Sequence, residues 1–177
     1  MSNTGSRTRQ LAVDAMLAAM CAVLGYISLD FISMKITFES VPILIGALLF
    51  GPLDGAAIGL IGTLIYQLLR YGVSTTTLLW ILPYVLCGLL VGWYASAHRF
   101  ELTQKQMLFI VVVAELMVTL LNTGVIFVDS KIYGYYTPAL ITGSLALRLV
   151  ICVGKAVAYA FALLPLLNAV RKRRMIS

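Results

Sequence analysis

Long apolar runs separated by short polar connections constrain this chain more than any other feature of its sequence. Charged residues make up only 11% of its 177 residues, and the mean hydropathy is +0.98. Soluble domains carry about 25% charged residues. The runs approach the length of about 20 residues that a membrane-spanning helix needs, and they lack the repeated alternation of a membrane β-barrel. We therefore expect an all-α integral membrane protein.

The runs predict a single membrane domain, residues 1–177, built as a bundle of six transmembrane helices. The expected helices have approximate limits of 9–29, 40–50, 55–70, 77–97, 104–128 and 137–170. An even number of spans places both termini on one side of the membrane. That side also collects most of the basic residues, namely Arg7, Arg9, Arg99, Lys105 and the run at 171–174. Because basic residues favour the cytoplasmic side, we expect cytoplasmic N- and C-termini.

Two cations lie deep in the last apolar run. Arg148 and Lys155 each cost roughly 2.5–3.5 kcal/mol on insertion scales, so each requires a partner or a task. Glu115 on the preceding run falls at a similar depth and can neutralise one of them. Either the charges form a structural ion pair, or one cation is left to bind an anionic solute. By depth, Lys155 suits Glu115 better, and Arg148 suits a substrate entering from outside.

Further polar and aromatic residues are expected near the outer ends of the helices. Together with Arg148 they suit an aromatic ligand with carboxylates, because arginine binds carboxylates bidentately and aromatic rings stack. This outer set comprises Lys35, Tyr66, Arg70, Trp80, Asn122 and the three tyrosines of the 129–137 connection. Those tyrosines can equally form an interfacial aromatic belt.

Two other segments carry recognisable patterns. Apolar residues alternate with polar ones from Met34 to Glu39, which predicts an extended segment over a pocket. Alanines fill the first half of the first helix, with Ala15 and Ala19 one turn apart. Small residues at this spacing let another helix approach closely, either within the chain or on another subunit.

Several chemistries have no sequence signal. The chain contains no phosphate-binding lysine loop, no nucleophile elbow and no zinc-protease motif. We therefore expect no catalytic residues, no metal site, no cofactor and no ATPase site in this chain. No basic domain suggests nucleic-acid binding.

At this point the sequence resembles a known family. The segment from Lys35 to Gly55 reads KITFESVPILIGALLFGPLDG. It is similar to the run in which folate-family members place a basic residue before an apolar-proline-apolar helix and a Leu-Phe-Gly-Pro turn. With six spans, the alanine-rich first helix and the basic tail, the chain resembles the substrate-binding S-components of energy-coupling factor (ECF) vitamin transporters. Arg148 corresponds to a basic residue on the last helix of those members.

The resemblance implies a function in a prokaryotic cell membrane. The chain would bind a vitamin, most naturally folate, from outside with high affinity. It would then dock through Ala15 and Ala19 on a transmembrane coupling subunit, whose two cytoplasmic ATPases hydrolyse ATP, and would topple to release the vitamin inside. Lys35, Arg70 and Arg148 would meet the glutamyl carboxylates. Glu39 or Asn122 would face the pterin, and Trp80 or a tyrosine such as Tyr66 would stack on a ring.

Three alternatives remain at this level. The substrate can be another vitamin, such as pantothenate or cobalamin. The chain can be a small membrane enzyme acting on a lipid or isoprenoid, or a structural protein without a ligand.

Overall fold

The computed structural model describes residues 3–27, 29–31 and 34–176, and within these it contains six α-helices. They are α1 (Asn3–Tyr26), α2 (Ser40–Phe50), α3 (Pro52–Tyr71), α4 (Thr77–Ala97), α5 (Gln104–Ile132) and α6 (Pro138–Ile176). The all-helical membrane fold expected from the sequence is confirmed. Five helices contain an apolar stretch long enough to cross a membrane; α2, with 11 residues, is shorter.

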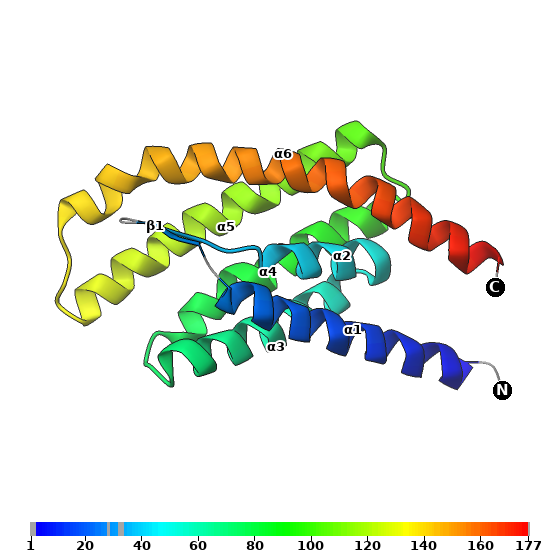
Figure 1. Ribbon diagram of the computed structural model, residues 1–177, viewed down its shortest axis with the longest axis horizontal. Coiled ribbons are helices and arrows are strands. Elements are labelled where there is room, and N and C mark those ends of the chain that lie inside the picture. The colour runs from blue at the N-terminus through cyan, green and yellow to red at the C-terminus, as the bar shows by residue number, and fades with distance from the viewer. Residues whose placement is uncertain (1–2, 28, 32–33, 177) are drawn as a thin grey trace.

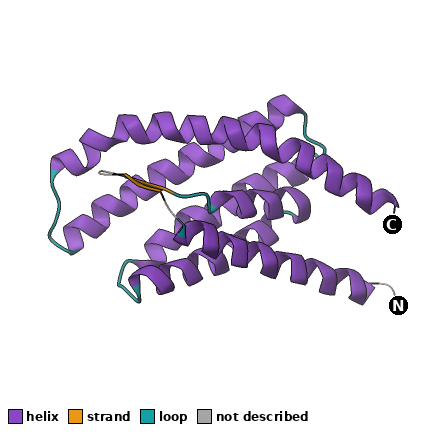
Figure 2. Cartoon of the chain, viewed as in Figure 1, coloured by secondary structure: helices purple, strands orange, loops and turns teal. Residues whose placement is uncertain are grey.

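Two short strands connect α1 to α2. β1 (Leu29–Phe31) and β2 (Met34–Ile36) pair antiparallel, with Asp30 opposite Lys35. The alternation that begins at Met34 therefore does mark extended backbone, and Figure 2 shows this pair as the strand element among the helices. The first helix ends at Tyr26 rather than at residue 29, because residues 29–31 belong to the pair.

The turn between α2 and α3 is tighter than predicted. Gly51 has φ +112°, a backbone conformation that side chains oppose, and Pro52 follows at the first position of α3. A single residue therefore reverses the chain, and α3 begins at Pro52 instead of Gly55. In the connection between α4 and α5, the Thr103 hydroxyl accepts from the Gln106 N–H and the Gln106 side chain accepts from the Thr103 N–H, which caps α5.

α2 lies at the centre of the molecule. It packs against α1, α3, α4 and α6, while α3, α4, α5 and α6 contact one another in chain order. Its side chains Ile43, Leu44, Ala47 and Leu48 are fully buried. Figure 1 shows the start of α1 and the end of α6 at one end of the bundle. The strands, the α3–α4 connection and the α5–α6 connection lie at the opposite end. The two ends of the chain therefore lie at the same end of the bundle, as the even number of helices predicts.

Glycines set the distance between α3 and α4. A Cβ placed on Gly88 would lie 2.3 Å from the carbonyl carbon of Gly55, and one on Gly59 would lie 2.7 Å from the Tyr84 carbonyl oxygen. The two backbones therefore touch, as small residues allow in membrane helices.

We predict that Gly88→Val destabilises the protein by about 1–3 kcal/mol, because the added carbons overlap the α3 backbone. Thermal unfolding in detergent measures this change. Gly124→Val is the matched control, since nothing lies within 4 Å of a Cβ at that helical position. Equal melting temperatures for the two variants would contradict the role of the α3–α4 contact.

Candidate functional site

A cavity of about 500 Å³ opens in the half of the bundle that faces away from the termini. This volume is within the range of sites for drug-sized ligands, about 300–1,000 Å³. Its walls come from the segment between β2 and α2, the ends of α3 and α4, and long stretches of α5 and α6. Five of the residues predicted to bind a substrate line it: Glu39, Tyr66, Trp80, Asn122 and Arg148.

The other two predicted substrate residues are Arg70 and Lys35. Arg70 is not among the lining residues; its Nη1 donates to the carbonyl oxygen of Tyr26, 2.9 Å away, at the end of α1. Its guanidinium also lies 5.9 Å from the ring centres of Tyr26 and Tyr71. Arg70 thus joins α3 to the C-terminal end of α1, where a cation is favoured. The side chain of Lys35 lies outside the described part of the structure, although its backbone belongs to β2.

Glu115 and Lys155 form an ion pair across α5 and α6. The Lys155 Nζ lies 3.2 Å from the Glu115 Oε2, and the Glu115 side chain is 1% exposed. This is the pairing that helix depth favoured. Lys155 Nζ also lies 3.4 Å from the carbonyl oxygen of Thr37, which connects α6 to the segment that follows β2.

Of the two deep cations on α6, Arg148 has no carboxylate partner among the described residues. It is partly buried on α6, its Nε is shielded from solvent, and no described residue accepts a hydrogen bond from that nitrogen. No described carboxylate forms an ion pair with it, since Glu115 is held by Lys155. A partly buried guanidinium that lines a cavity is suited to an anionic group of a ligand.

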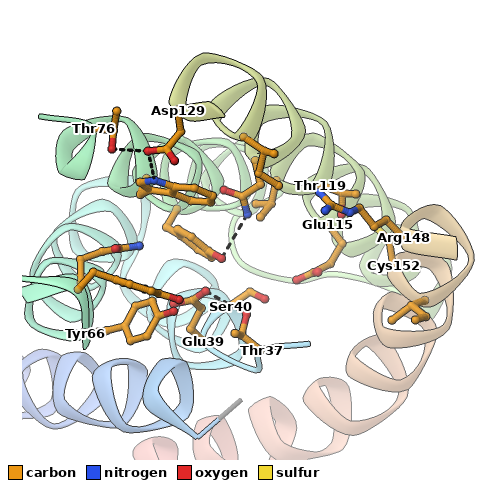
Figure 3. A pocket seen from close by; sticks show the side chains of 18 of the residues that line it. Thr37, Glu39, Ser40, Tyr66, Thr76, Glu115, Thr119, Asp129, Arg148 and Cys152 are labelled. Atoms are coloured by element: carbon orange, nitrogen blue, oxygen red, sulfur yellow. Dashed lines mark hydrogen bonds between the residues drawn. The ribbon is translucent and has the colours of Figure 1, made fainter. Parts of the chain in front are cut away.

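Glu39 lies on a different side of the cavity from Arg148 (Figure 3). It is 2% exposed, and its Oε1 accepts a hydrogen bond of 3.0 Å from the Thr37 hydroxyl. A Cβ on Gly25 would lie 2.8 Å from the Glu39 Oε2, so α1 packs directly against this carboxylate. The cavity therefore has a carboxylate on one wall and a guanidinium on another.

Asp129 joins the α3–α4 connection to the α5–α6 connection, a role that the sequence did not single out. Its Oδ1 accepts from the Thr76 hydroxyl at 2.5 Å and from the Trp80 Nε1 at 3.4 Å. Its Oδ2 accepts from the Tyr135 hydroxyl. Figure 3 shows Thr76 and Asp129 at the same edge of the cavity. An aspartate at the end of an apolar run and before three tyrosines was the only signal available in the sequence.

The tyrosines after α5 take part in this edge. The Tyr133 hydroxyl lies 3.1 Å from the Thr75 hydroxyl, and this hydrogen bond lowers the pKa of Tyr133. Burial, followed by the hydrogen bond to Asp129, raises the pKa of Tyr135 to about 12. Its hydroxyl therefore stays protonated and remains a donor throughout the neutral range. Both tyrosines line the cavity, which favours a ligand-facing role for them over a belt alone.

Aromatic rings of α4 are held in fixed orientations. Trp80 is oriented by its bond to Asp129, and the Tyr84 hydroxyl accepts from the Asn122 Nδ2 at 3.3 Å. Both rings line the cavity. Rings fixed in this way lose little conformational freedom when a flat ligand stacks on them.

The alanines of α1 divide into two faces. Ala18 and Ala22 are buried, and a Cβ on Gly62 of α3 would lie 2.9 Å from the Ala18 carbonyl oxygen. Ala15 and Ala19 are exposed on the outside of the bundle. Packing within the chain therefore accounts for one stripe, and the other stripe is free for a partner.

Comparison with known proteins agrees with this architecture. Residues 9–168 match the family described as "ECF transporter, substrate-specific component", and the chain belongs to that family. No curated protein matches it closely enough to report. The chain is similar to a solved structure described as "Structure and mechanism of the S component of a bacterial ECF transporter". The two share 19% identity with a TM-score of 0.65, over 94% of this chain and 97% of the other.

Membership establishes the general role. The chain is a membrane-embedded, substrate-binding component of an ECF transporter, a transporter subunit rather than an enzyme. The cavity described above is its candidate substrate site.

We predict that Asp129→Ala loosens this edge of the cavity, because Trp80 and two hydroxyls lose their shared acceptor. A buried donor that loses its acceptor destabilises the folded state by about 1–3 kcal/mol. In a Trp93→Phe background, Trp80 is the only tryptophan, and we expect stronger quenching of its fluorescence by acrylamide. Lys131→Ala is the control at the same helix end, since Lys131 contacts Phe127 and Tyr136 instead. Unchanged quenching in the aspartate variant would count against the role given to Asp129.

Proposed function

We propose that this protein binds folate as the S-component of an ATP-driven importer in a prokaryotic cell membrane. The cavity would open to the outside, and both termini would lie in the cytoplasm. The distribution of basic residues supports this orientation, because Arg7, Arg9, Arg99 and Lys105 belong to the end of the bundle that carries the termini.

The observation that carries the proposal is the unpaired guanidinium of Arg148 in a cavity that also holds a buried carboxylate. A ligand that satisfies both needs an anionic group and hydrogen-bond donors at a distance from it. Folate has glutamyl carboxylates at one end and a pterin with N–H donors at the other. In this proposal Arg148 binds a carboxylate, and Glu39 or Asn122 faces the pterin.

The aromatic residues support a ligand with flat rings. Trp80 and Tyr84 have fixed orientations on α4, and Tyr66, Tyr133 and Tyr135 border the same cavity. Rings of this kind stack on planar heterocycles. Pantothenate, which has no ring, would make little use of them. A corrinoid such as cobalamin is far larger than a pterin and would strain a cavity of about 500 Å³.

The exposed stripe of Ala15 and Ala19 is proposed to dock on a transmembrane coupling subunit. Two cytoplasmic ATPase subunits would supply the energy, and toppling of this chain would release the vitamin inside. The small exposed side chains support such a contact because they let a partner helix approach closely.

We predict that Arg148→Ala weakens folate binding by about 100-fold, the loss expected when a charge-assisted hydrogen-bonded pair is removed. Isothermal titration of the purified protein in detergent measures the affinity. Arg148→Lys should retain part of it, because the charge remains but the bidentate geometry does not. Arg99→Ala, at the opposite end of the bundle, is the control.

Two results would change the proposal. If Arg148→Ala binds folate with wild-type affinity, Arg148 does not contact the ligand. Binding of pantothenate or cobalamin without binding of folate would assign a different vitamin to the same S-component.

We also predict that Ala15→Arg combined with Ala19→Arg abolishes transport while leaving ligand affinity unchanged. The long charged side chains would block the close approach of a partner helix, and neither position lines the cavity. Uptake into cells that contain the complete transporter and titration of the purified subunit measure the two properties. Ala18→Arg is the comparison variant, because that buried position should disrupt the fold itself. Loss of ligand binding in the double variant would show that the stripe serves internal packing.

A further inference from the structure

Only one of the two carboxylate oxygens of Glu115 has a partner among the described residues. Its Oε2 is held by the Lys155 ammonium at 3.2 Å, whereas no described residue donates a hydrogen bond to its buried Oε1. The side chain is 1% exposed, yet it belongs to the wall of the cavity. A buried carboxylate oxygen without a donor is costly, and such atoms in native proteins call for an explanation.

The surroundings of Glu115 restrict what can approach this oxygen. On α5 it is flanked by the buried apolar residues Ala114 and Val118, and Ile151 and Cys152 of α6 belong to the same cavity lining. Because Glu115 and Lys155 together carry no net charge, a ligand ion of either sign would be attracted by one partner and repelled by the other. A neutral N–H group can donate to the carboxylate oxygen without placing a further charge beside the pair.

Lys155 fixes which oxygen faces the ligand. Its Nζ contacts both the Glu115 Oε2 and the carbonyl oxygen of Thr37, so the ammonium is held from two sides. Lys155 thereby keeps Oε2 occupied and leaves Oε1 for the cavity. Figure 3 shows Glu115 on the side of the cavity that also carries Arg148 and Cys152.

We infer that Glu115 is a substrate-recognition residue that accepts a hydrogen bond from a neutral N–H of the ligand, with Lys155 as its positioning residue. This inference rests on the proposed folate-binding function and deepens it. Folate offers two sources of such a group. One is the amide N–H that joins the aminobenzoyl group to glutamate, next to the carboxylates assigned to Arg148. The other is the amino-substituted edge of the pterin.

The test uses two variants that both lack the ion pair. Glu115→Gln with Lys155→Met keeps a neutral acceptor at position 115, whereas Glu115→Met with Lys155→Met removes it at similar volume. Neither variant buries an unpaired charge, and matching thermal unfolding curves verify that both fold equally well. Wild-type protein is titrated first with folate, then both variants with folate and two analogues. One analogue replaces the glutamyl amide by an ester, and the other replaces the 2-amino group by methyl.

We expect the glutamine variant to bind folate about 3- to 10-fold more tightly than the methionine variant, the value of one neutral hydrogen bond. The difference should vanish for the analogue that lacks the recognised N–H, and this identifies the source. Equal folate affinities for the two variants, or a difference that persists with both analogues, would overturn the inference while leaving folate binding intact. Failure of the wild-type protein to bind folate would instead overturn the proposed function together with this inference.

Discussion

The ion pair between Glu115 and Lys155 is the interaction on which the rest of the site depends. An isolated charge in the hydrocarbon interior is costly, so the fold must supply a partner for each one. By placing these two side chains 3.2 Å apart, the fold fixes α5 against α6 and leaves Arg148 as the cation that the described protein groups do not neutralise. The same lysine reaches the backbone of Thr37. One pair thus relates the helix interface, the ligand site and the segment that follows the strands.

The end of the bundle opposite the termini is organised by a second carboxylate with a different function. Asp129 accepts hydrogen bonds from side chains of two separate connections and from the indole of Trp80. Glu115 lies two successive seven-residue steps before it on α5, which corresponds to about 21 Å along the helix. Glu115 is paired with a lysine, whereas Asp129 is surrounded by hydroxyl and indole donors. The two ends of one helix wall therefore suit different parts of a ligand.

Most of the fold follows from the sequence because apolar runs in a membrane must be helical. The strand β1, which pairs with β2, was not predicted because the apolar residues of 29–31 continue the pattern of α1. Arg148, Tyr66, Trp80 and Asn122 were proposed from residue type and depth, which are properties of single helices, and Glu39 was proposed from the family resemblance. The structure places all five in the cavity lining, and their contact with a substrate stays a prediction. Arg70 was expected in the cavity but contacts the end of α1, since only the tertiary structure brings the Tyr26 carbonyl near it. Asp129 was missed for the same reason, because its donors Thr76 and Trp80 come from a distant part of the chain.

The short length of α2 gives a reason for the cavity to exist at all. Eleven residues extend about 16 Å, roughly half of the hydrocarbon thickness. Because α2 turns into α3 through Gly51 at the end of the bundle that carries the termini, its apolar side chains fill only that half of the bundle. A full-length central helix would occupy the other half as well and leave no room for a solute. Binding capacity in this protein is therefore a property of backbone length, and side-chain chemistry decides only which solute uses the space.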